Sequence, residues 1–222
     1  MKTTRIVPTM LLALTVSACA MLTAPLSSSL KQGQEMPSNQ VLVIGKFVLD
    51  PPLEQGSLAG MSAARGTLRG VIKLLLTKDL SRPVKPEDLV PLAPEELIDV
   101  KYPGTSFIPL SPGTRYVRLG QYATSVSGRF VNPATSSMRI ADVNTLWLYA
   151  DIRLTIPANA KAVYIGTIVY RHDGYNTAAV AVRDEYADAT QQLTAMKLSS
   201  IRPKDVVKSL ATVVGKPLQR KR

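Results

Sequence analysis

The stretch TLWLYADIRLTI, residues 145–156, alternates between two kinds of side chain with a period of two. One set is apolar throughout: Leu146, Leu148, Ala150, Ile152 and Leu154. The other set mixes aromatic, charged and hydroxyl groups: Trp147, Tyr149, Asp151, Arg153 and Thr155. Successive side chains of a strand point to opposite faces of its sheet, so this stretch predicts a strand with one face in a core.

Composition favours more strands of this kind over long helices, because the chain has 16 prolines. Residues 40–50, QVLVIGKFVLD, are rich in Val, Ile and Phe and end at the strand-breaking pair Pro51-Pro52. Hydrophobic residues make up 45% of the chain, which is enough for a packed core and unlike a disordered sequence.

Turn residues between β-rich runs predict hairpins. The turn SPGT precedes the run RYVRLGQYATSV, so we expect a hairpin over residues 106–126. The turns PANA and DGYN separate three further runs, and Asp173-Gly174 is the strongest of these signals. Residues 145–186 are therefore predicted to form three consecutive antiparallel strands.

The chain changes character after residue 183. Residues 183–198, RDEYADATQQLTAMKL, have a helical composition with acids early and a lysine late, which suits the helix dipole. Residues 202–217, RPKDVVKSLATVVGKP, start with a proline and stop at Gly-Lys-Pro, which predicts a second helix. The predicted fold is mainly β, an antiparallel β-sandwich with one or two C-terminal α-helices; a small β-barrel is the alternative.

The chain begins with a basic segment, a short apolar run and small residues, the three parts of a secretory signal. The apolar run is shorter than the roughly 20 residues that a membrane-spanning helix needs. Val16-Ser17-Ala18-Cys19 resembles the lipobox of bacterial lipoprotein precursors, and Cys19 is the one cysteine of the chain. An ordinary signal-peptidase site at Ala18-Cys19-Ala20 is the alternative.

The lipoprotein resemblance implies cleavage before Cys19, a diacylglycerol thioether on its sulfur, and acylation of the new amino terminus. Ala20, in place of an aspartate, implies the outer membrane. Several acyl chains hold a protein firmly on a bilayer, whereas one chain does so only marginally. The predicted organisation is a signal peptide over 1–18, the lipidated cysteine and a flexible tether over 19–39, the β-sandwich over 40–183, and a helical segment with a basic tail over 184–222.

Two later stretches, FIPLSPGTRYVRLGQYA and IPANAKAVYIGTIVY, resemble the strand pattern of transthyretin-like sandwich domains. In such domains a Pro-Gly turn leads into a Tyr-rich strand, and a later strand has an apolar centre that contains glycine. The resemblance implies a small two-sheet domain and names no activity.

The formal net charge is +11, which attracts polyanions or simply keeps a protein soluble. Cations concentrate near the carboxyl end: Lys197, Arg202, Lys204, Lys208, Lys216, Arg220, Lys221 and Arg222. The candidate interaction surface has two parts. One is the set of cations from Lys204 to Arg222, and the other is Trp147, Tyr149 and Arg153 on the mixed face of residues 145–156. There is an alternative for each group. Another element of the fold could cover the mixed face, and the cations could form a solvated basic tail with no ligand.

Candidate catalytic groups are few. His172, beside Asp173, is either a general base or a residue that closes a turn. The carboxylate pairs Glu95-Glu96 and Asp184 with Asp188 could perform acid/base work on a glycan, but ordinary helix-start electrostatics are the favoured explanation of both. The glycine-spaced loop from Gly56 to Gly70 matches no phosphate-binding motif. We expect no enzyme activity, no cofactor and no metal.

The sequence therefore predicts a lipid-anchored outer-membrane lipoprotein that faces the periplasm and acts as a non-catalytic accessory or structural component of an envelope assembly. Its expected partners are the membrane, through the anchor, and an envelope protein, with an acidic polysaccharide or lipid as a further candidate and no nucleic acid. The alternative is a binding module for an anionic envelope polymer, lipopolysaccharide or peptidoglycan. A glycan hydrolase is the third hypothesis.

Overall fold

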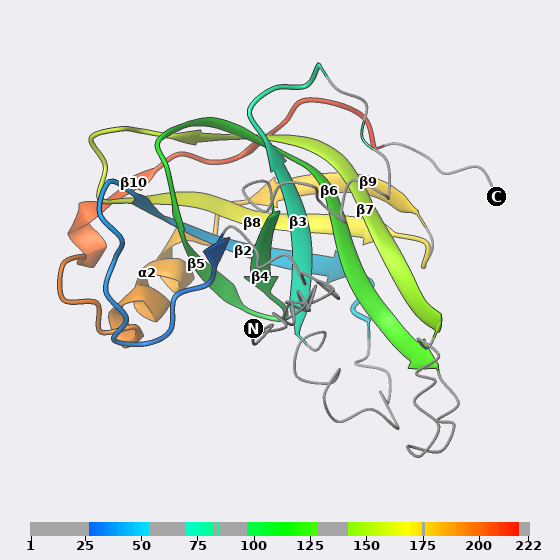
Figure 1. Ribbon diagram of the computed structural model, residues 1–222, viewed down its shortest axis with the longest axis horizontal. Helices are drawn as coiled ribbons and strands as arrows, with labels where there is room; N and C mark the ends of the chain where they lie inside the picture. Colours follow the sequence, from blue (N-terminus) through cyan, green and yellow to red (C-terminus); the bar gives the residue numbers. More distant parts are fainter. Residues whose placement is uncertain are drawn as a thin grey trace, which may run out of the picture.

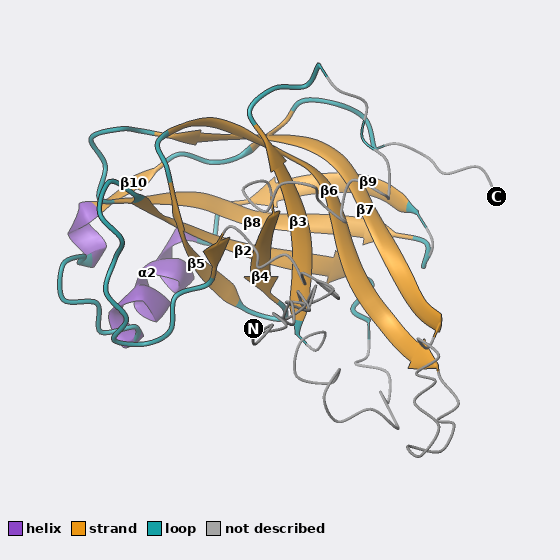
Figure 2. Cartoon of the chain, in the orientation of Figure 1, coloured by secondary structure: helices purple, strands orange, loops and turns teal. Residues whose placement is uncertain are grey.

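The structure is a computed structural model that describes residues 27–53, 70–81, 84, 97–127, 142–174 and 176–217. These residues form two packed β-sheets, one α-helix and a 3-10 turn (Figure 1, Figure 2). The predicted β-sandwich with a C-terminal helix is confirmed. The signal peptide and Cys19 lie outside the described residues.

Sheet A has six strands in the order β1 (Ser27–Ser28), β4 (Leu97–Lys101), β3 (Val71–Thr77), β6 (Gly113–Ser127), β7 (Asp142–Ile156) and β11 (Thr212–Val213). Sheet B has the order β10 (Val206–Lys208), β8 (Ala162–His172), β2 (Val41–Asp50) and β5 (Thr105–Leu110), and β9 (Thr177–Arg183) also pairs with β8. Most neighbouring strands are antiparallel, but β2 and β10 both run parallel to β8, and β1 runs parallel to β4.

The main core lies between the sheets, and β7 contributes to it as its alternation predicts. The five apolar residues of the inward face are all buried in this core: Leu146, Leu148, Ala150, Ile152 and Leu154. Strand β8 is buried on both faces, because Val163 and Ile165 point into the same core while Ala162 and Tyr164 face a second cluster outside sheet B.

Helix α2 (Tyr186–Ala195) covers that second cluster. Ala189 and Leu193 are its buried residues, and they pack with Leu42 and Tyr164 of sheet B. Leu30, from the start of the described chain, is buried in the same cluster. The helix thus gains its stability from an apolar face laid on the sheet, as expected for a helix of only three turns.

Two of the predicted hairpins are wrong, and one is confirmed. Strands β8 and β9 pair antiparallel around Asp173-Gly174. Strands β5 and β6 belong to different sheets, and so do β7 and β8, so the turns before Gly113 and before Ala162 carry the chain from one sheet to the other. A turn sequence reverses the chain, but it does not determine whether the two strands pair side by side or stack face to face.

The amino end of the described chain joins the two sheets, and we call residues 27–30 the N-terminal clasp. Ser27 and Ser28 pair with β4 of sheet A, while Leu30 N–H donates to the Phe107 carbonyl of β5 in sheet B at 2.7 Å. Phe107 N–H donates in turn to Ser29 Oγ at 2.9 Å. Residues 27–30 therefore pack with the folded domain, although the sequence predicts a tether over residues 19–39.

The carboxyl end makes the same kind of connection on the other side, and we call residues 206–214 the C-terminal clasp. Strand β10 pairs with β8, and Ser209 and Ala211 extend that contact by donating to the carbonyls of Tyr164 and Ile165 at 2.9 and 2.8 Å. The chain then crosses to sheet A, where β11 pairs with β7 (Figure 1, red segment).

The second predicted helix, over residues 202–217, is therefore wrong. A 3-10 turn, η4 (Pro203–Asp205), is its one helical part, and strands β10 and β11 follow. The β-branched residues of VVKSLATVV suit strands, and the open edges of β8 and β7 supply the hydrogen-bond partners that a helix would have to provide internally.

Two buried tyrosines of β8 give a matched test of this packing. The Tyr164 hydroxyl accepts a hydrogen bond from Glu185 N–H at 2.7 Å, whereas the Tyr170 hydroxyl has no partner among the described residues. We expect Tyr164→Phe to lower the free energy of unfolding by about 1–2 kcal/mol, because it leaves a donor unpaired. Tyr170→Phe is expected to leave it equal or higher. Urea titrations of both variants measure the difference; a large loss in Tyr170→Phe would reveal a partner for its hydroxyl.

Candidate functional site

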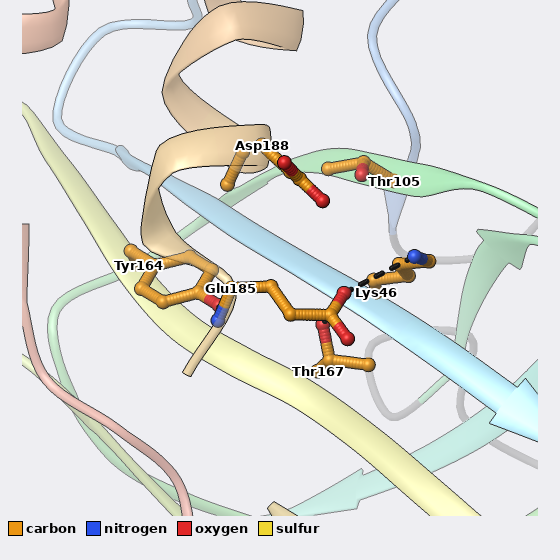
Figure 3. Close-up of a pocket in the computed structure, with 7 residues that line it drawn as sticks. Lys46, Thr105, Tyr164, Thr167, Glu185 and Asp188 are labelled. Atoms are coloured by element: carbon orange, nitrogen blue, oxygen red, sulfur yellow. Dashed lines mark hydrogen bonds and ion pairs between the residues drawn. The ribbon is translucent and has the colours of Figure 1, made fainter. Parts of the chain in front are cut away.

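A small polar hollow lies where α2 meets sheet B (Figure 3). Its lining comes from three strands and from the start of the helix: Lys46 of β2, Thr105 of β5, Tyr164 and Thr167 of β8, and Glu185, Asp188 and Ala189. Asp188 was already a candidate from its sequence spacing, but the strand residues were not, because they come from segments far apart in the chain.

Glu185 is the centre of this hollow. Its carboxylate accepts a hydrogen bond from Lys46 Nζ at 3.1 Å and another from the Thr167 hydroxyl at 2.9 Å (Figure 3). Its backbone N–H donates to Tyr164, as described above. One residue at the start of the helix is thus connected to β2 and to β8 at once, which fixes where α2 sits on the sheet.

The chemistry of the hollow is that of a structural ion pair. Burial alone would raise the pKa of Glu185, but the hydrogen bonds from Lys46 and Thr167 and the Lys46 charge together hold that pKa below its ordinary value. A general acid at neutral pH needs the opposite shift. The free space is about that of one water molecule, so a sugar ring does not fit.

The lowered pKa of Glu185 predicts a pH dependence of stability. A carboxyl whose pKa is lower in the folded state stabilises the fold fully above the unfolded pKa and loses this contribution as pH falls through the folded one. We expect the stability difference between wild type and Glu185→Gln to be constant above about pH 5 and to shrink below the ordinary value of 4.5. Urea titrations from pH 3 to pH 7, on the order of five points, measure it. A constant difference over the whole range would contradict the assignment.

The sequence left two roles open for His172, a general base or a residue that closes a turn. In the structure it closes a turn. Its Nδ1 accepts a hydrogen bond from Gly174 N–H at 3.0 Å. Nε2 therefore carries the proton and donates to the Pro51 carbonyl at 2.9 Å. Both ring nitrogens are occupied by backbone groups and the side chain is buried, so neither nitrogen is free to take a proton from a substrate.

The two carboxylates of the predicted pair Asp184 and Asp188 have different surroundings. Asp184 forms an ion pair with Lys208 Nζ at 2.7 Å, while Asp188 lines the hollow. The hydrogen bond from Lys208 lowers the pKa of Asp184. Glu95-Glu96 and the part of the glycine-spaced loop before Gly70 lie outside the described residues.

The mixed face of β7 is partly covered. Tyr149 is 6% exposed and packs with Leu75, Leu97 and Leu119 in a small cluster on the outer face of sheet A, and Trp147 lies partly buried against it. The prediction that Tyr149 belongs to an exposed interaction surface is wrong, because its side chain is buried in this cluster, against which Val84 also packs. Arg153, on the same face, is exposed.

The predicted cations fall into two groups. Lys204 and Lys208 are exposed near α2, and Lys208 is engaged by Asp184 and lies 4.9 Å from the centre of the Tyr186 ring. Lys216 is exposed and follows Gly215, which lies beside the Asp151 carboxylate of β7. Arg220, Lys221 and Arg222 lie outside the described residues.

In the part of the chain that the structure describes, no three His, Cys, Asp or Glu side chains are placed to hold a metal ion. No helix among those residues is long and apolar enough to cross a membrane. No protein-family model, curated protein or solved structure matches this chain. The similarities to lipoprotein precursors and to transthyretin-like domains therefore stay predictions from the sequence.

Proposed function

We propose that this chain is a lipid-anchored envelope lipoprotein whose sandwich domain acts by interaction, as an accessory or structural component of an assembly on the periplasmic face of the outer membrane. The observation that carries the proposal is the single cysteine, Cys19, directly after Val16-Ser17-Ala18 and a short apolar run. Acyl chains on this residue would hold the domain on the bilayer.

The position of the N-terminal clasp supports a domain that the anchor holds close to the membrane. Eight peptide units separate Cys19 from Ser27, so the two Cα atoms are at most about 29 Å apart in any conformation. Ser27 pairs with β4, so an anchor at Cys19 would connect to the domain at the β1 edge of sheet A. A domain held at this distance is suited to contacts near the membrane.

The state of the candidate catalytic groups favours interaction over catalysis. Glu185, Asp184 and His172 are each bound to other groups of the fold, through Lys46, Lys208 and backbone atoms respectively. A glycan hydrolase needs two carboxyl groups that flank an open sugar site, one of them protonated at neutral pH. The described carboxylates with shifted pKa values, Asp79, Asp184 and Glu185, are all shifted downward.

The test is the intact mass of membrane-purified protein, with detergent phase partitioning, for wild type, Cys19→Ala and the control Ala20→Ser. We expect wild type and the control to begin at Cys19, to carry the mass of the acyl groups and to enter the detergent phase. Cys19→Ala is expected to lack acyl mass. An unmodified wild-type chain cut after Ala18 or Ala20 would overturn the anchor.

The accessory role is tested separately, by cross-linking in intact cells and mass spectrometry of the cross-linked species. The proposal expects one defined envelope protein that is cross-linked reproducibly to the wild type. A glycan-cleaving activity that single Asp or Glu substitutions abolish would overturn the non-catalytic role.

A further inference from the structure

The C-terminal clasp carries most of the exposed large apolar side chains in the described part of the chain. Four such side chains are exposed there, and three belong to the clasp: Val207 at 44%, Leu210 at 40% and Val214 at 39%. Val206 and Ala211, which lie between them or beside them, are buried in the two core clusters. The clasp is thus fixed to the domain by one set of side chains and leaves the other set, the aliphatic stripe, in solvent. Exposed apolar groups that gather in one segment indicate a contact surface.

The clasp is also the edge of both sheets. Strand β10 is the last strand of sheet B and β11 the last strand of sheet A, so no further strand of the described structure covers them (Figure 1). Val207 and Val214 are seven residues apart, so the aliphatic stripe is at most about 25 Å long. It follows one side of the sandwich, where the chain crosses from sheet B to sheet A.

A cation of sheet A lies beside the aliphatic stripe. Arg153 is exposed on the outer face of β7, because its neighbours Ile152 and Leu154 point into the core. Its register partner is Thr212 of β11, which is exposed and lies in the chain between two residues of the stripe. Lys216 is exposed two residues after the stripe ends. Positive charge therefore borders the part of the stripe that crosses onto sheet A.

A cation of sheet B lies beside the stripe as well. Arg183 is exposed on the outer face of β9, because its neighbour Val182 packs against the core. A Cβ added to Gly166 would lie 3.1 Å from the Arg183 carbonyl oxygen and 3.3 Å from Leu210 Cδ2, so Arg183 and Leu210 are neighbours. The stripe thus has an arginine from each sheet beside it.

Carboxylates near the clasp do not neutralise these cations, because other groups of the fold bind them. Three are held in ion pairs: Asp151 with Arg118 at 2.9 Å, Asp184 with Lys208 at 2.7 Å, and Glu185 with Lys46 at 3.1 Å. Asp205 accepts a hydrogen bond from the Arg202 N–H at 2.9 Å. Arg153, Arg183 and Lys216 have no ion-pair partner among the described residues. Their charges are available to an external anion.

We call the stripe and these three cations the clasp surface, and its composition fits a lipid bilayer better than a protein. The clasp sequence, VVKSLATVV, has no aromatic residue, and its exposed side chains are aliphatic ones separated by polar ones. Val, Leu, Ser and Thr are under-represented among the residues that dominate protein interfaces, where Trp, Tyr and Arg prevail. Fluid acyl chains accommodate separate aliphatic side chains without a matching surface, and anionic headgroups attract the flanking cations.

We propose that the clasp surface binds anionic phospholipid bilayers, with the aliphatic stripe at the boundary of the acyl chains and the arginines of both sheets at the phosphates. This inference goes beyond the proposed function, because it does not require an anchor at Cys19. The two contacts are compatible. The chain between Cys19 and Ser27 spans up to about 29 Å, and the six strands of sheet A, about 4.8 Å apart, separate their outer edges by about 24 Å.

The experiment is vesicle flotation of the full-length Cys19→Ala protein, which lacks the lipidation site. One set of vesicles contains phosphatidylglycerol and phosphatidylethanolamine, and the other is phosphatidylcholine, which has no net charge. The charge variant adds Arg153→Gln and Arg183→Gln. Its matched control adds Lys31→Gln and Lys101→Gln, which removes the same charge from exposed positions next to β1 and in β4, near the opposite edge of sheet A.

We expect the Cys19→Ala protein to bind the anionic vesicles more tightly than phosphatidylcholine. The charge variant should bind them about 30-fold more weakly, and the control should bind like Cys19→Ala. A third variant, with Val207→Thr and Leu210→Gln, should bind about tenfold more weakly although its charge is unchanged. High salt should weaken binding, because it screens the attraction between the cations and the headgroups. Binding through other segments of the chain is common to all of these proteins.

Three outcomes would contradict the inference. The first is no flotation with anionic vesicles; a cross-link from position 210 to an acidic envelope protein would then assign the surface to a protein partner. The second is an equal loss in the charge variant and its control. The third is unchanged binding of the aliphatic variant, which would mean that the charges attract polyanions without entry into the bilayer. Thermal midpoints verify that every variant is folded. Because the background lacks the lipidation site, a failure of the anchor and a failure of this inference are separate results.

Discussion

Truncation of the chain after Asp205 is expected to abolish cooperative unfolding of the domain. The truncation removes the C-terminal clasp, and with it the buried side chains of Val206 and Ala211. It also removes the backbone hydrogen bonds from Ser209, Ala211 and Val214 to β8 and β7, so the edges of both sheets become exposed. The loss is on the order of 5 kcal/mol, since buried apolar side chains contribute about 1–3 and hydrogen bonds about 1 kcal/mol each.

A loss of this size is comparable with the whole stability of an ordinary domain. The matched control is truncation after Pro217, which keeps the clasp and removes only the basic tail. We expect the control to unfold at the wild-type midpoint in a thermal circular dichroism scan, and the longer truncation to show no sharp transition. If both truncations unfold like wild type, the clasp contributes little and the two sheets hold together without it.

Gly166→Ala is expected to destabilise the domain far more than Gly174→Ala. Both glycines have a positive φ, +97° and +89°, which costs an alanine about 1–2 kcal/mol. Open space surrounds Gly174, whereas a Cβ on Gly166 would lie 2.7 Å from Val182 Cγ1 and 3.1 Å from the Arg183 carbonyl oxygen. The backbone of β9 cannot move away without breaking its pairing with β8, so we expect a further 1–3 kcal/mol at Gly166.

Thermal midpoints measure this difference. In a domain of this size each kcal/mol lowers the midpoint by about 2–4 °C, so Gly166→Ala, at about 2–5 kcal/mol in all, should lose about 4–20 °C and Gly174→Ala, at about 1–2 kcal/mol, about 2–8 °C. Because the two variants share the same backbone strain, the difference between them isolates the close approach of β9 to β8. Equal losses would mean that the strands separate easily at this point.

Local patterns predicted much of the secondary structure. The alternation over residues 145–156 correctly assigned the five inward residues that it named, Leu146 to Leu154, because a strand shows its buried face in its own sequence; Ile156, which the prediction did not name, is buried in the same core. Asp173-Gly174 predicted the β8–β9 hairpin, and the acids before residue 189 marked the start of α2. Each of these signals depends on residues a few positions apart.

Local patterns failed where the outcome depended on distant partners. Residues 202–217 have a proline, regularly spaced apolar residues and a glycine stop, yet the open edges of β8 and β7 draw them into strands. The sequence alone indicates that Tyr149 is exposed on the mixed face of β7. In the folded domain it is buried in a cluster with Leu75 and Leu97, which come from two other strands. The two turns that join different sheets have the same local composition as hairpin turns.

The candidate sites also depend on contacts between distant residues, which local sequence patterns do not indicate. Lys46 and Glu185 are separated by 139 residues, and nothing near either residue indicates their contact. Arg153 was named from the sequence, but its pairing with Thr212 depends on the crossing of the C-terminal clasp onto β7. The sequence by itself determined the β-rich class, the inward face of β7, one helix and the signal that predicts an anchor, because each is encoded in neighbouring residues. The tertiary structure alone decided which strands pair, which side chains are covered and which charges meet, since these depend on the free energy of burying surfaces contributed by distant segments.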